Sequence, residues 1–256
     1  MTGYLGTTAR MVPVAAASAQ SEARPDRFVV QQAASRRWAF DTARRGGVQR
    51  REWAVDLGLL DAVEMAAVDE FVQGAWGPGP FRWVSCAAHD SNVLTPGQSI
   101  LAPLDAGTGM DTASGWSPRS VLGPSPVKLA ERVPVIPGKP VTVAVETTGA
   151  ATLTVAFRSA AGGVVAMPSR TASGTLAQRL VYSATAVAPE ARTVDVEVSG
   201  HIRASRPQVT WTREARPWVP GRGAEQVVIQ SGASDPVVIN PAGGYWSGSL
   251  SLIEVG

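Results

Sequence analysis

The sequence predicts a mainly β protein in which a small domain of one β-sheet and one helix carries an inserted antiparallel β-sandwich of jelly-roll type. The first indication is composition, because the 256 residues include 26 Gly and 19 Pro but only 17% charged residues, which is typical of short strands joined by turns. The second is that only residues 60–74 have helical periodicity. The third is a series of short apolar strands between residues 140 and 213. This length favours two domains.

Residues 1–26 are predicted to form an extended N-terminal arm without regular structure. The segment 10–19 superficially resembles a signal peptide, but its apolar part is short, contains Pro13 and follows a single arginine. Arms of this kind often embrace a neighbouring subunit. We therefore expect a role in assembly for this segment.

A β-hairpin is predicted for residues 36–41 and 49–57. Gly46–Gly47 lies between them, and glycine pairs accept the positive φ angles of tight hairpin turns. The second strand has apolar residues at every second position, as a half-buried strand does. A two-residue turn at the glycines would place Phe40 opposite Trp53.

The helix is predicted over residues 60–74. Asp61 and Glu64 have the spacing of a capping box at its start, and the Gly-Pro-Gly-Pro turn at 77–80 follows its end. A further strand is expected at 81–84. The predicted apolar stripe of the helix consists of Leu60, Val63, Ala67 and Phe71.

Strands dominate the rest of the chain, and they suggest a discontinuous first domain. We expect the residues 27–90 plus 221–256 to form it, with 91–220 as the inserted sandwich. A C-terminal strand at 246–255 would then pair within 27–90 and cover an otherwise open sheet edge. The other predicted strands lie at 140–147, 151–158, 163–167, 175–187, 192–199, 207–213, 225–230 and 236–239.

No motif for catalysis, cofactor binding or metal binding is present, so neither an enzyme nor a cofactor is predicted. The chain has one cysteine and two histidines, His89 and His201, and both histidines are expected in polar linkers or turns. Asp195 and Glu197 share one face of a valine-rich strand, which predicts a solvent-exposed face. The alternatives for this pair are a weak calcium site or the carboxylates of a glycoside hydrolase.

Two further groups of residues are candidates for binding. One is a basic cluster at the predicted hairpin, for which the alternatives are a solvated hairpin, a subunit contact, or a positive surface facing DNA or an acidic partner. The subunit-contact candidates are Arg44, Arg45, Arg50 and Arg51. The other is a set of aromatic residues that either stack on sugars or belong to the core. The sugar-binding candidates are Trp116, Tyr182 and Trp211, with Trp218 and Trp246 as further aromatics.

Three stretches carry a resemblance to a known family. Residues 36–84 end in a Gly-Pro-Gly-Pro-Phe turn before a tryptophan-bearing strand, 91–96 read Ser-Asn-Val-Leu-Thr-Pro, and 249–255 form a terminal strand. Together they resemble minor tail proteins of long-tailed actinobacteriophages. The second stretch is similar to the start of the jelly-roll module of such proteins, although Val93 stands where leucine is usual.

The resemblance implies a structural virion protein at the distal tail or tail tip. The first domain would be akin to the ring-forming domain of tail tube and distal tail proteins, and the sandwich would contact host-surface glycans. The expected partners are further copies in a hexameric or trimeric ring, the tail tube, tail hub and tape measure proteins, and no membrane insertion is expected. The alternative function is a secreted glycan-binding module that does not assemble into tails.

Overall fold

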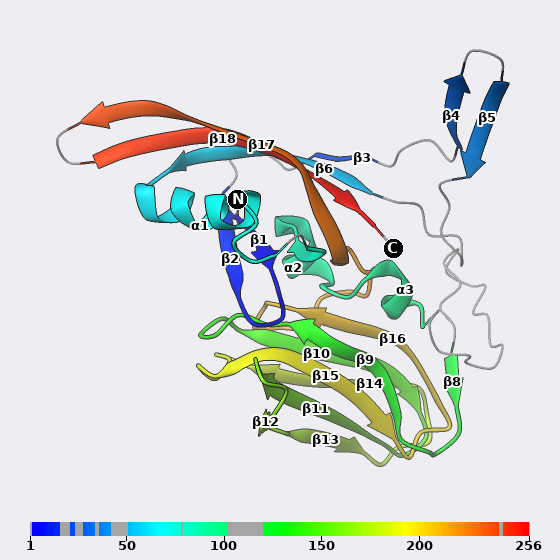
Figure 1. Cartoon of the computed structure of the whole chain (residues 1–256). Coiled ribbons are helices and arrows are strands. Elements are labelled where there is room, and N and C mark those ends of the chain that lie inside the picture. The colour runs from blue at the N-terminus through cyan, green and yellow to red at the C-terminus, as the bar shows by residue number, and fades with distance from the viewer. Residues whose placement is uncertain are drawn as a thin grey trace. The chain divides into compact units, whose positions relative to one another are not determined.

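The computed structural model describes residues 2–15, 21–23, 28–33, 36–41, 51–77, 79–101, 120–240 and 243–255. The chain divides into two compact units. Unit 1 comprises Met1–Leu5, Val12–Trp83 and Ala224–Gly256, and unit 2 comprises Gly6–Met11 and Val84–Gly223. Strands build most of both units, as Figure 1 shows, so the predicted mainly β class is confirmed.

Unit 1 contains a seven-stranded sheet with the order β2-β1-β7-β17-β18-β6-β3. The C-terminal strand β18 lies beside β6 in antiparallel register, with Leu250 opposite Val55, so the expected return of the chain end to the first segment is confirmed. The strands of this sheet are β1 (Thr2–Gly6), β2 (Met11–Ala15), β3 (Ser21–Ala23), β6 (Glu52–Leu60), β7 (Phe81–Val84), β17 (Ala224–Asn240) and β18 (Gly243–Glu254).

The helix α1 (Ala62–Val72) begins with the predicted capping box. The Asp61 carboxylate accepts hydrogen bonds from the backbone N–H groups of Val63 and Glu64, each at 2.8 Å. The Glu64 carboxylate accepts one from the Asp61 N–H at 3.2 Å, which completes the reciprocal pair. After the helix, Gly74 has a φ of +77°, a conformation that favours glycine and ends the helix.

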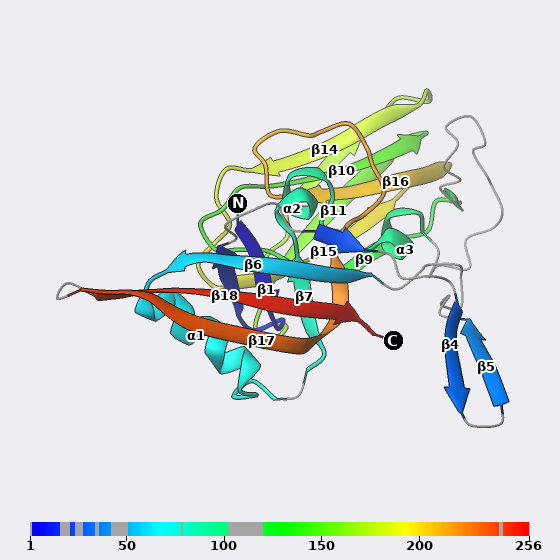
Figure 2. The ribbon, with the colours of Figure 1, turned by 90° about the horizontal axis from the view of Figure 1, so that it is seen from above.

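The buried stripe of α1 differs from the predicted one. Met65, Val68 and Phe71 are buried, whereas Val63 is 78% exposed. The helix packs under β17, β18 and β6, as Figures 1 and 2 show, and this contact turns Val63 away from the sheet. The core of unit 1 combines that stripe with one face of the sheet and consists of Leu5, Val12, Val14, Trp53, Val55, Leu57, Leu60, Met65, Val68, Phe71, Phe81, Trp83, Ala224, Val227, Leu250 and Leu252.

The predicted N-terminal arm at 1–26 is wrong, because this segment supplies three strands of the unit 1 sheet. Leu5 and Val14 are completely buried, and Val12 is nearly so. Val12 and Val14 flank the exposed Pro13 in a period of two, which is the pattern of a half-buried strand. The burial of these apolar side chains is what holds the segment in the sheet.

The predicted hairpin between residues 36–41 and 49–57 is also wrong. Strand β5 (Arg36–Asp41) pairs with β4 (Phe28–Ala33), which places Phe40 opposite Val29. Trp53 is opposite Leu252 of β18. Strand β6 has β18 on one side, and on the other side β3 pairs with its first residues, Glu52 to Ala54. The Gly46–Gly47 pair lies outside the described residues.

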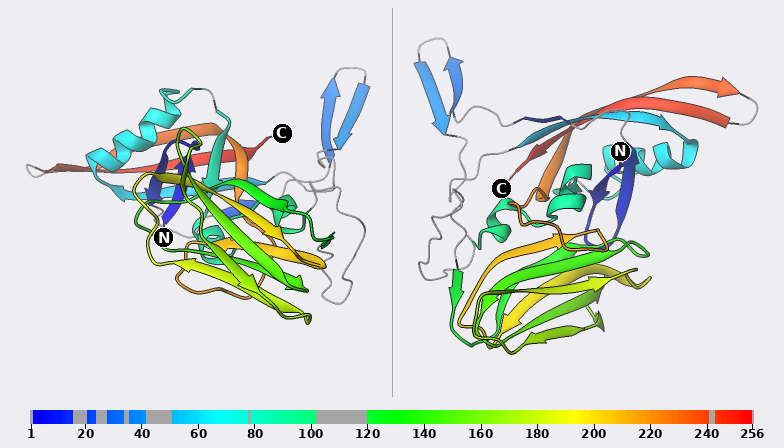
Figure 3. Two further views of the ribbon diagram at one scale, coloured as in Figure 1. Left: turned by 90° about the horizontal axis from the view of Figure 1, so that it is seen from below. Right: turned by 180° about the vertical axis from the view of Figure 1, so that it is seen from behind.

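Unit 2 is an antiparallel β-sandwich, which confirms the predicted architecture (Figure 3). One sheet has the order β14-β10-β16-β8, and the other has the order β12-β11-β15-β9 with β13 also paired to β11. Its strands are β8 (Ser120–Leu122), β9 (Val127–Pro134), β10 (Val141–Thr148), β11 (Ala151–Ser159), β12 (Val164–Ala166), β13 (Ser169–Ala172), β14 (Gln178–Ala184), β15 (Ala191–Ser199) and β16 (Arg203–Thr210).

Alternating valines fill the space between the two sheets. On β15, Val194, Val196 and Val198 are fully buried. On β10 the same is true of Val143 and Val145. One face of each strand is therefore apolar, as a half-buried strand requires, and the opposite face carries polar and charged side chains.

Two short helices, α2 (Cys86–Ser91) and α3 (Pro96–Ser99), precede the sandwich strands in unit 2. Asn92, which follows α2, is completely buried. Its amide oxygen accepts hydrogen bonds from the N–H groups of Leu94 and Val209, and its amide nitrogen donates to the Val219 carbonyl at 2.9 Å. Asn92 thereby ties three separate segments of unit 2 together.

Candidate ligand-binding face of the sandwich

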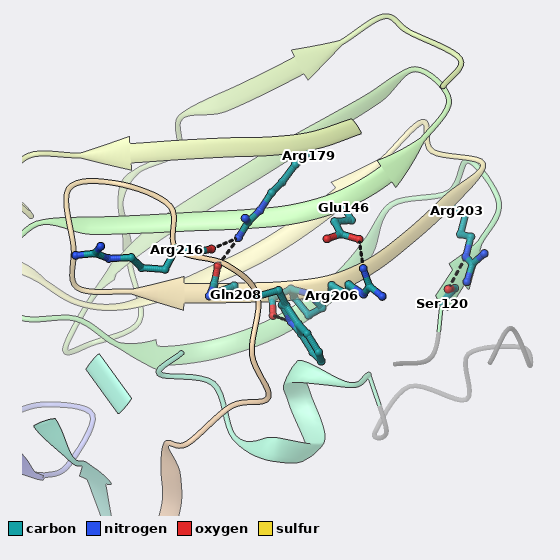
Figure 4. A network of polar contacts seen from close by, with 9 residues as sticks. Ser120, Glu146, Arg179, Arg203, Arg206, Gln208 and Arg216 are labelled. Carbon is teal, nitrogen blue, oxygen red and sulfur yellow. Dashed lines mark hydrogen bonds and ion pairs between the residues drawn. The ribbon is translucent and has the colours of Figure 1, made fainter. Parts of the chain in front are cut away.

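The outward face of the four-stranded sheet carries several arginines in register. Glu146 of β10 lies opposite Arg179 of β14 on one side and opposite Ser205 of β16 on the other. Thr148 lies opposite Arg203, two residues further along the same strands. Directly opposed residues of antiparallel strands project from the same face, so these side chains share one surface. Figure 4 shows this surface from close by.

Gln208 holds Arg179 in place from within the unit. The Gln208 side chain is 1% exposed, and its amide nitrogen donates to the carbonyl oxygens of Ser91 and Pro217 at 2.8 and 3.0 Å. Its amide oxygen accepts a hydrogen bond from Nη2 of Arg179, which also donates to the carbonyl oxygen of Arg216 at 2.6 Å. The guanidinium of Arg179 is therefore anchored at one of its nitrogens.

Arg206 occupies an irregular position of β16. Its φ is +52°, and the register between β10 and β16 shifts at this point, as at a β-bulge. Its Nη1 donates to the Glu146 carboxylate at 3.0 Å, and its guanidinium lies 5.8 Å from the ring centre of Trp218. The Trp218 indole in turn donates to the Pro207 carbonyl at 3.2 Å. The bulge thus brings a cation, an anion and an aromatic ring together.

We call the outward surface formed by Glu146, Arg179, Arg203, Arg206 and Trp218 the arginine face. Its three guanidinium groups outnumber its single carboxylate. On the five-stranded sheet, by contrast, Arg158 pairs with Asp195 at 2.5 Å and Lys128 with Glu131 at 2.7 Å. Two ion pairs on that sheet are thus matched, and the arginine face has a local excess of positive charge.

Sequence reasoning missed Arg179, Arg206 and Gln208 because no local motif connects them. The alternation of Arg179, Val181 and Ser183 with inward residues on β14 was a signal that Arg179 faces outward. Only the strand register reveals that these side chains meet.

The carboxylates predicted for a solvent face occupy different surroundings. Asp195 is 5% exposed, and its carboxylate accepts hydrogen bonds from the Arg132 N–H at 2.8 Å and from the Arg158 guanidinium. Arg132 has a φ of +51° at a register shift between β15 and β9, so this carboxylate secures a bulge. Full solvent exposure is therefore wrong for Asp195, while Glu197 is half-buried.

The two predicted sugar-binding aromatics that the structure describes, Tyr182 and Trp211, do not share one site. Trp211 is 7% exposed, stacks on His89 at 5.8 Å and donates from its indole to the Pro134 carbonyl, so it belongs to the core. Tyr182 is half-buried next to Phe157, and desolvation raises the pKa of its phenol. Trp116 lies outside the described residues. Trp218 is the candidate aromatic that lies on the arginine face.

Arg51 lies inside unit 1 and not at a hairpin tip. Its side chain is 3% exposed, and its guanidinium forms two hydrogen bonds with the Glu254 carboxylate at 3.1 and 3.2 Å. It also lies 5.0 Å from the ring centre of Trp53. The other three candidates for a subunit contact, Arg44, Arg45 and Arg50, are outside the described residues.

His201 is buried and not a polar turn residue as predicted. It is 1% exposed, and neither ring nitrogen has a hydrogen-bond partner within the described part of the chain. Desolvation lowers the pKa of its imidazole from the ordinary value of 6.5. The folded protein therefore holds this histidine in its neutral form to a lower pH than the unfolded chain does.

We expect this histidine to make the protein less stable in mild acid. Below pH 6.5 the unfolded chain binds a proton at His201 that the folded state resists, so the free energy of unfolding falls by at most about 1.4 kcal/mol per pH unit from this group. Denaturant unfolding between pH 7.5 and 5 measures the slope. His201→Leu should flatten it, and equal slopes for the two proteins would contradict the expectation.

The fold and the arginine face define this as a mainly β protein of two units, in which the outward face of one sandwich sheet carries three arginines. Neither a protein-family model nor a curated protein matches the chain significantly. Among solved structures, it is similar to the enzymatically active domain of tailspike protein 4 from bacteriophage CBA120, with 9% sequence identity and a TM-score of 0.26. The match covers 75% of this chain and 19% of the other, and a likeness of this size carries no argument about function.

Two properties of the described residues bear on other classes of site. No group of three or more His, Cys, Asp or Glu side chains that could hold a metal ion occurs among them. No helix in the same ranges has the length and apolar character needed to cross a membrane.

Proposed function

We propose that this protein is a structural minor tail protein of a phage virion. In this proposal unit 1 forms a ring at the distal tail with further copies of the chain, and the sandwich of unit 2 contacts host-surface glycans. The resemblance of residues 36–84, 91–96 and 249–255 to minor tail proteins of actinobacteriophages supports it. The separation of a sheet-plus-helix unit from a sandwich unit agrees with it.

The observation that carries the assembly proposal is the unpaired edge of β17 among the described strands. Strand β17 pairs with β18 from Val227 to Asn240, but its pairing with β7 covers only Ala224 to Val227. Beyond Val227, the other edge of β17 has no strand partner among the described residues. Unpaired edges are where a strand from another chain adds to a sheet. A second copy of unit 1 is the partner that this edge would take in a ring.

The proposed partners beyond the ring are the tail tube, tail hub and tape measure proteins. We propose no enzymatic activity and no cofactor. Asp195, one of the two carboxylates considered for hydrolysis, is engaged by Arg158 and by the Arg132 backbone, which is a structural use of its charge.

Shortening the β17–β18 hairpin tests the ring. A chain in which residues 237–245 are replaced by Asn-Gly would keep the pairing of β18 with β6 from Trp246 onward and lose the far part of the open edge. We expect the unmodified chain to form closed rings in electron micrographs. The shortened chain keeps the open edge from Val228 to Pro236 and loses it from there to Asn240, so we expect it to form markedly fewer rings at a similar melting temperature. Mass photometry gives the copy number.

An equal share of rings in the shortened and the unmodified chain would contradict a role for the far part of the β17 edge. Single particles from the unmodified chain at high concentration would contradict ring formation, and the secreted glycan-binding module would then be the better interpretation.

A further inference from the structure

We propose that the arginine face binds an acidic saccharide, a sugar chain that bears carboxylate or phosphate groups beside its hydroxyl groups. This inference deepens the proposed glycan contact and rests on that part of the proposed function. It places the contact on residues other than the aromatic candidates Trp116, Tyr182 and Trp211.

Unused hydrogen-bond donors are the first argument. Arg179 uses Nη2 for Gln208 and Arg216, and Arg203 uses Nε for Ser120 at 2.6 Å. Within the described residues, Nε and Nη1 of Arg179 and both Nη atoms of Arg203 have no protein partner. The planar fork of a guanidinium matches the paired oxygens of a carboxylate or phosphate, and such charge-assisted bonds are among the strong ones.

Pre-organisation is the second argument. The anchors of Arg179 include the buried Gln208, which is itself held by two backbone carbonyls of unit 2. Arg203 is bonded to Ser120, which is 0% exposed. Because these side chains already have fixed positions, a ligand would meet a smaller entropy cost than with free surface arginines.

The mixture of groups favours a saccharide over a nucleic acid. Glu146 lies among the arginines with one carboxylate oxygen on Arg206, and its other oxygen has no partner in the described part of the chain. A carboxylate here repels a continuous phosphate backbone but accepts hydrogen bonds from sugar hydroxyls. The half-buried Trp218 ring beside Arg206 adds an aromatic surface of the kind that packs on sugars.

The local excess of positive charge on the arginine face is the third argument. That face has three guanidinium groups and one carboxylate, Glu146. The arginine face has an excess of positive charge although the whole chain carries a net charge of only +2. A local excess on a weakly charged protein draws anions to that face.

Binding of oligogalacturonate to the purified full-length chain, followed by calorimetry, tests the proposal. The matched control ligand is the methyl-esterified oligomer of equal length, which keeps the sugar chain and removes the carboxylate charge. We expect binding to the acid form and at least ten-fold weaker binding to the ester. Phosphorylated dextran against plain dextran tests phosphate as the anionic group, and binding to either acidic ligand supports the proposal.

Three variants locate the site. Arg179→Gln and Arg203→Gln should each weaken binding of the acidic ligand roughly ten-fold or more, because each loses a charge-assisted contact. Arg170→Gln changes an exposed arginine of β13 in the other sheet and should leave binding unchanged. Thermal melting shows whether each variant is folded. If one of the two arginine variants unfolds, the other still tests the site.

Several results would overturn the proposal. They are equal binding of the acid and the ester, an equal loss in the Arg170→Gln variant, or tighter binding of a 20-base-pair DNA duplex than of either acidic saccharide. Saccharide binding can be measured whether or not the chain forms rings. Rings that bind no acidic saccharide would therefore contradict only this inference and not the ring proposal. Saccharide binding by a chain that never forms rings would remove only the ring.

Discussion

Replacing Arg51 with methionine should lower the free energy of unfolding by about 3–5 kcal/mol, because the change removes the guanidinium that forms two hydrogen bonds with the buried Glu254 carboxylate. Both side chains are 3% exposed, and two hydrogen bonds join them across the ends of β6 and β18. The methionine also removes a cation from the Trp53 ring. Denaturant unfolding at neutral pH measures the loss.

The ion pair Arg82–Glu225 provides the matched control within unit 1. Its closest approach is 4.0 Å, and the Glu225 side chain is 40% exposed. Glu225→Gln should therefore change stability by less than about 1 kcal/mol. The double variant Arg51→Met, Glu254→Leu should recover much of the loss, since it removes both buried charges. A loss below about 1 kcal/mol in the single Arg51 variant would show that the pair is dispensable.

Gly223→Ala should destabilise the protein by about 3 kcal/mol, because the new methyl group has no space. A Cβ built at Gly223 would lie 1.9 Å from the carbonyl oxygen of Val93, which belongs to rigid backbone. The Gly223 N–H donates to the Leu94 carbonyl at 3.0 Å, so the two segments cannot separate without losing this bond. Thermal or denaturant unfolding would record the change.

Gly97→Ala is the control for the second substitution. Its Cβ would meet nothing closer than the Thr95 hydroxyl at 4.0 Å, and Gly97 lies in α3, where alanine is the better helix former. We expect it to be neutral or slightly stabilising. Comparable losses at Gly97 and Gly223 would mean that steric overlap with Val93 is not the cause.

Local patterns predicted several elements of the fold. The capping box of Asp61 and Glu64 is a short-range signal, because its hydrogen bonds close within three residues. The valines of β15 alternate with polar residues, and that period of two identified a strand with one buried face. The pairing of β18 with β6 followed from the need to cover a sheet edge.

Such local patterns could not predict which strands pair with each other or which single residues are buried. Trp53 has the alternation of a half-buried strand in either pairing, but the sequence could not tell that Leu252 and not Phe40 lies opposite it. The choice depends on contacts some 200 residues apart, and alternation is the same for every candidate partner. The sequence did not reveal that Arg51 is buried for the same reason, because its ion-pair partner Glu254 lies at the far end of the chain.

Composition and local periodicity were enough to predict that this chain is mainly β, that one capped helix accompanies the first unit, and that a sandwich of short strands is inserted in it. The tertiary structure alone decided that the first residues form strands, that Asp195 secures a bulge and that Arg179, Arg203 and Arg206 share a face with Glu146. The physical reason is that a period of two places a side chain on a face, whereas register and bulges decide which distant side chains it meets.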